Sequence, residues 1–156
     1  MQQQPQPRLG FTVIAVLSLN QQDFLLRTYG AEMNKKDKPG RTPLIIGVQR
    51  GNLHIIEHLL ECRVRCNIAD NQGNYPLHYV MQAKTDSVFF ILHLLLNHGS
   101  FTLLDIANNQ GHTSLQELNG AEREYAQQND RDGLWRCSQI RMILHGFREK
   151  RSRSFS

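Results

Sequence analysis

The sequence lacks the features that define membrane-spanning and disulfide-stabilised proteins. Its 156 residues include three cysteines, Cys62, Cys66 and Cys137. This odd number, without a paired framework, argues for a reducing compartment. The longest apolar run, Leu9–Leu19, covers about eleven residues, whereas a membrane-spanning helix needs about 20. Arg8 before this run resembles a signal peptide, but no small-residue cleavage site follows, so we prefer a capping helix. We therefore expect a cytoplasmic protein that does not engage the membrane.

The sequence also lacks the residue patterns of catalysis. It has no Ser/His/Asp or Cys/His arrangement, no Gly-rich phosphate loop and no paired acids. We expect no enzyme activity, no cofactor and no small-molecule substrate. The net charge is +4, and part of the excess lies in residues 148–153, with no aromatic residues interleaved. This pattern argues against nucleic acid as the partner. A hydrophobic content of 40% and a charged content of 21% are typical of a folded chain.

What the sequence does contain is a turn that occurs three times. In residues 37–44, Asp37 favours the start of a turn and Gly40 tolerates a left-handed backbone near its end. Thr42 then suits an N-cap, and Pro43 suits the first helical position. The same pattern returns in residues 70–78 and 108–115, and Asp37 and Asp70 are 33 residues apart.

This pattern resembles the ankyrin-repeat family, whose period is 33 residues. Gly51 and Asn52 match the turn between the two helices of a repeat, and Ile55-Ile56 and Leu59-Leu60 match the buried face of its second helix. The resemblance implies an all-α solenoid of helix–turn–helix repeats with β-hairpin-like loops. We divide the chain into a disordered leader (1–9), an irregular N-terminal capping repeat (10–36), an ankyrin repeat (37–69), an ankyrin repeat with insertions (70–107), a degenerate C-terminal repeat with a long loop (108–147) and a basic tail (148–156).

Within the first full repeat, we expect helices at about 43–50 and 53–61. Arg63 stands where the family has glycine, and this substitution removes an easy left-handed helix terminator, so we expect a strained or rearranged loop there. Residues 119–133 are polar without a clear period and predict a long loop. The tail after residue 148 is predicted to be disordered. Because the stack is short, we also expect marginal stability in the absence of a partner.

Two groups of residues invite a chemical interpretation. His54, His58, Cys62 and Cys66 are spaced four apart, so a zinc site is one alternative. We prefer solvated histidines and core-packed cysteine, and expect no metal, because the resemblance places the end of a helix and a turn here. His78 stands near a helix start, where the resemblance implies a structural role: hydrogen bonds that tie neighbouring turns together.

The C-terminal residues leave several alternatives open. The tail from Arg148 to Ser154 suits a nuclear-entry signal, a phosphorylation-controlled charge switch or a solubilising end. Trp135 and Phe147 are expected to close the exposed end of the final helix. The segment between them is alternatively a module that docks onto another complex, such as a ubiquitin ligase, although it contains no recognisable ligase-docking box.

The resemblance implies that hairpin tips and the inner face of each first helix bind a partner protein. The corresponding residues are Lys38, Pro39, Arg41, Gln49, Arg50, Asn71, Gln72, Asn74, Gln82, Asn109, Gln110 and His112. Lys35 and Lys36 flank the first hairpin, so we expect it to face an acidic part of the partner.

The function that we predict is a non-enzymatic adaptor or scaffold that binds a protein of unknown identity. The alternative is a protein similar to inhibitors of NF-kappa-B, which would sequester a Rel-type transcription factor. Residues 108–115, preceded by a lengthened loop, favour this alternative. The short chain and the missing acidic tail count against it. Nuclear as well as cytoplasmic location remains open.

Overall fold

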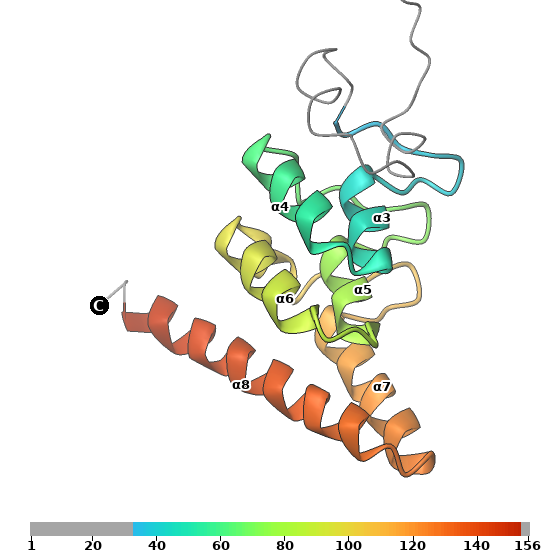
Figure 1. The fold of residues 1–156 in the computed structure, drawn as a ribbon, viewed down its shortest axis with the longest axis vertical. Helices are drawn as coiled ribbons and strands as arrows, with labels where there is room; N and C mark the ends of the chain where they lie inside the picture. Colours follow the sequence, from blue (N-terminus) through green and yellow to red (C-terminus); the bar gives the residue numbers. More distant parts are fainter. Residues whose placement is uncertain (1–32, 154–156) are drawn as a thin grey trace, which may run out of the picture.

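The fold is a stack of helix pairs, seen in a computed structural model that describes residues 33–153. The pairs are α3 (Pro43–Arg50) with α4 (Leu53–Glu61), α5 (Pro76–Gln82) with α6 (Val88–Asn97), and α7 (Ser114–Gln127) with α8 (Arg131–Arg153). A short 3-10 helix, η1 (Ser100–Leu103), follows α6. Helices α3, α5 and α7 form one layer and α4, α6 and α8 the other (Figure 1).

The predicted all-α solenoid is confirmed in residues 33–153, where the only strand-like feature is an isolated bridge between Ala107 and Thr113. The predicted leader and most of the predicted capping repeat lie outside the described residues. Within residues 33–153, no helix is both long and apolar enough to span a bilayer.

Local side-chain chemistry sets the ends of the first helix pair. The Thr42 hydroxyl accepts a hydrogen bond from the Ile45 amide at 3.3 Å, and Pro43 occupies the first turn of α3. α3 ends at Gly51, which has a left-handed φ of 65°. Asn52 then caps α4 by accepting from the Ile55 amide at 3.2 Å. The helix boundaries predicted for this repeat are therefore confirmed.

The end of α4 shows how the chain turns without the usual glycine. Arg63 adopts a φ of 57°, a left-handed conformation that strains a residue with a Cβ. The Arg63 amide donates to the Leu60 carbonyl at 2.9 Å, and the Val64 amide donates to Leu59 at 3.2 Å. These two bonds form a Schellman motif. The predicted strain is confirmed, because the chain keeps the family's turn with arginine in the position that favours glycine.

The core lies between the two helix layers and continues from one pair to the next. Four leucines from α4, α5, α6 and α7 are fully buried, with 0% exposure: Leu59, Leu77, Leu92 and Leu118. On α6 a wide apolar face is buried except for Phe89, which is half-buried; its other residues are Val88, Ile91, Leu92, Leu95 and Leu96. This face packs against α4, α5 and α8.

The predicted long loop at 119–133 is wrong, because α7 runs to Gln127 and α8 begins at Arg131. Thr113 and Gln116 form a capping box that starts α7. The helix buries only a narrow stripe that includes Leu118 and Tyr125. No described repeat follows the pair α7–α8 to cover the outer side of α7, so polar residues there indicate exposure and not a loop.

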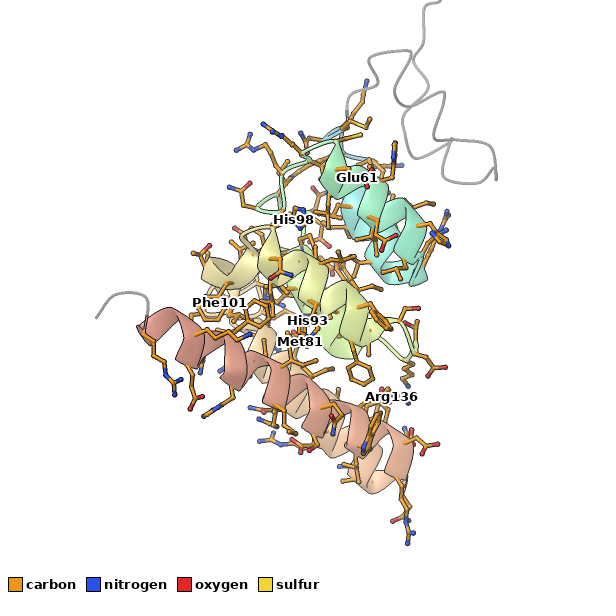
Figure 2. All side chains as sticks on the ribbon, turned by 60° about the vertical axis from the view of Figure 1, so that its left-hand side comes forward. Glu61, Met81, His93, His98, Phe101 and Arg136 are labelled. Atoms are coloured by element: carbon orange, nitrogen blue, oxygen red, sulfur yellow. The ribbon has the colours of Figure 1, made fainter. Side chains whose placement is uncertain are left out.

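The predicted disorder of the tail is also wrong for residues 148–153, which continue α8. Arg148 pairs with Asp105 at 3.4 Å, and cations near a helix C-terminus interact favourably with its dipole. Phe147 is half-buried, and its ring lies 5.6 Å from that of His93. His93 lies on α6, on the side of that helix where α8 passes (Figure 2). Trp135 meets Phe89 edge to face at 5.6 Å but is 57% exposed, so it closes the end only in part.

Candidate protein-binding surface

Three turns of the same construction precede the first helices of the stack. Their closing backbone bonds join Asp37 to Arg41 at 2.9 Å, Asp70 to Asn74 at 3.0 Å and Asn108 to His112 at 2.9 Å. In each turn, a side-chain oxygen of the first residue accepts hydrogen bonds from backbone amides of the same turn; these first residues are Asp37, Asp70 and Asn108. Each turn also has a glycine with φ between 78° and 85°. The turns are therefore rigid before any partner binds.

Asparagine side chains bond neighbouring turns to one another. The Asn71 side-chain amide donates to the Lys38 carbonyl at 3.1 Å, and that of Asn109 donates to the Asn71 carbonyl at 3.1 Å. Backbone bonds from Asn71 to Pro39 at 3.1 Å and from Asn109 to Gln72 at 2.9 Å run beside them. We call this column of three bonded turns, residues 37–41, 70–74 and 108–112, the hairpin ladder. It lies on one side of the first-helix layer (Figure 1).

His78 joins the ladder from within the helix stack. Its Nδ1 accepts from the Tyr75 amide at 3.2 Å, so the ring proton must be on Nε2, which donates to the His112 carbonyl at 3.1 Å. The side chain is 1% exposed, and this burial lowers the pKa of His78 below its usual value, against the raising effect of the His112 carbonyl. The predicted structural role of His78 is confirmed.

In the first turn, an ion pair restrains one of the predicted binding cations. The Arg41 guanidinium contacts the Asp37 carboxylate at 2.8 Å and donates to the Gln49 side chain at 3.1 Å. Arg41 therefore holds the turn against α3, and Asp37 offsets its charge. Lys38 and Lys36 are exposed and are better placed to give this turn its positive potential.

Glu117 on α7 organises the other end of the surface. Its carboxylate accepts hydrogen bonds from the side-chain amides of Gln82 at 2.8 Å and Asn108 at 3.1 Å. The Nδ1 atom of His112 lies 3.3 Å from the same carboxylate. The sequence interpretation missed Glu117 because it placed this region next to a loop. The sequence signal that was available is the position of Glu117, a carboxylate three residues after Ser114, where the helix starts.

The twelve predicted binding residues all lie on the hairpin ladder or at the ends of α3 and α5. Arg41 and Asn74 are half-buried and the rest are exposed. The side chains of Asn71 and Asn109 join one turn to the next, and Asn74 accepts from Asn108 at 2.8 Å. Their contribution to partner binding stays a prediction.

Asp70 of the second turn also holds the side chain of Tyr79 on α5. The Tyr79 hydroxyl donates a hydrogen bond to the Asp70 carboxylate. Burial, followed by this bond, raises the pKa of Tyr79 to about 12. Tyr79 is therefore a neutral donor at physiological pH, and it anchors the second turn to the helix that follows it.

The four residues considered as zinc ligands are not brought together. His54 points outward, with a side chain that is 96% exposed, and lies 3.9 Å from Glu57. His58 is buried, contrary to the predicted solvation, and its Nε2 lies 3.8 Å from the Cys62 sulfur. The Cys66 sulfur faces the Val64 carbonyl in the core. Residues 33–153 contain no cluster of three or more metal-ligating side chains.

The stacked helix pairs and the bonded turns define a helical-repeat scaffold of the class that binds other proteins. A sequence model of the family described as "Ankyrin repeats (3 copies)" matches residues 13–102. The chain therefore belongs to the ankyrin-repeat family, whose repeats are protein-interaction modules. The helix pair α7–α8 continues the stack beyond the matched residues.

Similar proteins include much longer chains. The probable E3 ubiquitin-protein ligase XBOS34 of Oryza sativa subsp. japonica is 31% identical over 103 residues, which cover 58% of this chain and 19% of that protein. Human ankyrin repeat domain-containing protein 63 is 32% identical over 107 residues, covering 62% of this chain and 28% of the relative. The chain thus spans less than a third of either protein.

A solved structure shares the fold. The ankyrin repeat domain of Bcl-3, described as a unique member of the IkappaB protein family, matches with a TM-score of 0.57 and 24% identity. The match covers 67% of this chain and 44% of the Bcl-3 chain. At this identity the likeness shows the fold alone.

Proposed function

We propose that the chain is an adaptor that binds a partner protein along the hairpin ladder and the adjoining ends of α3 and α5. The observation that supports this most directly is that neighbouring turns are bonded to one another while their tip side chains stay exposed. A preorganised surface loses little conformational entropy on binding, so its contacts translate efficiently into affinity.

The partner's matching surface is acidic at the first turn and polar at the next two. Lys36 and Lys38 are exposed at the first turn, whereas Gln72, Asn109 and Gln110 offer amides further along. Complementary charge at an exposed rim mainly accelerates association and depends on salt. The exposed side-chain amides of the second and third turns favour partner groups that form hydrogen bonds.

The test begins with capture of partners from a cell lysate by the intact chain, followed by affinity measurements on the purified partner. Lys36→Glu with Lys38→Glu reverses the exposed charges without touching the Arg41–Asp37 pair. We expect weaker affinity and a smaller salt dependence. Arg131→Glu with Arg153→Glu on α8 changes the net charge equally and serves as the control. If both double variants bind like the unaltered chain, the ladder is not the binding surface.

Sequestration of a Rel-type transcription factor stays the alternative prediction from the sequence. It is distinguished by the identity of the captured protein. The cytoplasmic location is likewise a proposal, supported by three free cysteines in the described chain. Microscopy of the tagged chain tests it, and accumulation in the nucleus would favour the nuclear-entry interpretation of the C-terminal residues.

A further inference from the structure

A cavity of about 330 Å³ lies between the end of α5 and the middle of α7, next to the hairpin ladder. Its lining residues are Gln82, Lys84, Glu117, Gly120, Ala121, Glu124 and Tyr125. We propose that this cavity receives an arginine side chain of the partner protein. The inference rests on the proposed function and specifies the chemistry of one contact.

The first argument is the charge of Glu117. Its side chain is only 14% exposed, yet the groups that hold it, the Gln82 and Asn108 amides and the His112 ring, bring no permanent positive charge. A carboxylate removed from water without a cation is electrostatically unfavourable, and a cation entering the cavity compensates it. The hydrogen bonds from Gln82 and Asn108 keep the carboxylate in place for that cation.

The second argument is the aromatic side of the cavity. The Tyr125 ring already has two cations near it, the Lys84 amino group at 5.5 Å and the Arg136 guanidinium at 6.0 Å from the ring centroid. An aromatic face attracts cations, and a planar guanidinium stacks on it. Tyr125 is only 4% exposed, so its ring forms a wall of the cavity, and this wall together with the Glu117 carboxylate favours a guanidinium over other side chains.

Lys84 is the group that an incoming arginine displaces. Its amino group lies 3.7 Å from the Glu124 carboxylate, and both side chains are more than half exposed, at 63% and 55%. Exposed pairs of this kind are weak because solvent screens them. A guanidinium that bonds a carboxylate through two parallel N–H groups is stronger than a single ammonium contact. We therefore expect arginine to bind more tightly than lysine.

Gly120 leaves space in the cavity for the arginine side chain, because it has no side chain of its own. A Cβ built on this residue meets no atom within 4 Å, so the cavity is open above it. A larger side chain at this position enters the cavity without disturbing the packing. Because glycine is about 1 kcal/mol less favourable than alanine within a helix, such a substitution does not weaken α7.

The experiment is a titration of the ¹⁵N-labelled full chain with the peptide acetyl-Gly-Arg-Gly-amide, followed by NMR at the Gly120 and Ala121 amides. A matched peptide contains citrulline, which has nearly the same shape and no charge. We expect saturable shifts in the millimolar range with arginine and at least tenfold weaker binding with citrulline. Equal shifts with the two peptides would overturn the proposal.

Two variants test the cavity itself. Glu117→Gln removes the charge and keeps the shape, and Gly120→Leu fills the space. Both should weaken arginine binding at least tenfold. Gly146→Leu is the matched control, because a Cβ at that helical glycine on α8 also meets no atom within 4 Å. Binding to Gly120→Leu that equals binding to Gly146→Leu would contradict the assignment.

The same variants separate this inference from the proposed function. If Gly120→Leu weakens binding of the purified partner at least tenfold, the cavity is part of the interface. If it leaves partner affinity unchanged while Lys36→Glu with Lys38→Glu weakens it, the cavity assignment is wrong and the hairpin ladder remains the binding surface.

Discussion

Gly73 of the second turn lies in contact with Asn109 of the third turn. A Cβ built on Gly73 would stand 2.5 Å from the Asn109 side-chain oxygen and 2.8 Å from its backbone nitrogen. Gly40 has the same relationship to Asn71, with a nearest approach of 2.2 Å. At Gly111 a Cβ would meet nothing within 4 Å, because no described turn follows the third one. The turn glycines thus serve two purposes, a left-handed backbone and close stacking of repeats.

This difference predicts unequal effects of the same substitution. Gly111→Ala should cost about 1–2 kcal/mol of stability, because φ of 81° strains any residue with a Cβ. Gly73→Ala, at a φ of 78°, should cost about 1–3 kcal/mol more, because it also forces the third turn away. Urea unfolding measures both. Equal losses would show that the contact between the turns relaxes freely.

Acid should destabilise the chain through His78. Burial lowers its folded-state pKa below the unfolded value, so the unfolded chain binds the proton more readily. The stability from neutral His78 is present above the ordinary histidine pKa, and it is lost as the pH falls toward the lowered folded-state value. Urea midpoints at pH 7.5 and 5.5 test this in the unaltered chain and in His78→Gln.

The variant isolates His78 from the other histidines. We expect His78→Gln to cost about 1–3 kcal/mol at pH 7.5, because it disrupts the buried bonds to Tyr75 and His112. It should also lose less stability than the unaltered chain between pH 7.5 and 5.5. An unchanged pH dependence would assign the acid sensitivity to another group.

Replacing Arg63 should stabilise the chain. Glycine removes about 1–2 kcal/mol of left-handed strain and loses about 0.5–1 kcal/mol in backbone entropy. Arg63→Gly should therefore raise the unfolding free energy by up to about 1.5 kcal/mol. Asn129→Gly, at a φ of 53°, is the control with a smaller expected gain, since asparagine tolerates this conformation. A loss of stability in Arg63→Gly would mean that the arginine side chain contributes more than its backbone costs.

The second helix of the first full repeat should be essential to the stack. Leu59 is 0% exposed, and Leu59→Ala should cost about 2–5 kcal/mol. Because a short stack has few interfaces to share this loss, the variant is expected to unfold at much lower urea. Leu53→Ala, at a half-buried position on the same helix, is the milder comparison. Similar midpoints for the two variants would show that Leu59 is not a central core residue.

The parts of the fold that depend on local chemistry were predictable. The helix bounds around Thr42, Gly51 and Asn52 follow from caps and a left-handed glycine, which act within one turn of the chain. The link from His78 to the next turn was predictable from the family resemblance, and the structure places it at His112. These features depend little on what packs around them.

The features of α7 and α8, the last described helix pair, were not predictable in the same way. The polar sequence of α7 resembles a loop unless one knows that Leu118 and Tyr125 face a neighbour and that the other side faces solvent. The close crossing of α7 and α8 depends on Gly133, where a Cβ would come within 2.4 Å of the Tyr125 ring. No local sequence pattern predicts the contact between Gly133 and Tyr125.

The sequence by itself determined the repeat, its turns and its helix caps, because these follow from backbone conformations and hydrogen bonds between residues a few positions apart. Only the tertiary structure decided which polar side chains remain available to a partner. Asn71 is bonded to Lys38 of the first turn, Asn109 is bonded to the second turn, and Glu117 accepts a hydrogen bond from Gln82 of another helix. Such groupings join residues distant in the chain, and the spacing of residues in one repeat does not specify them.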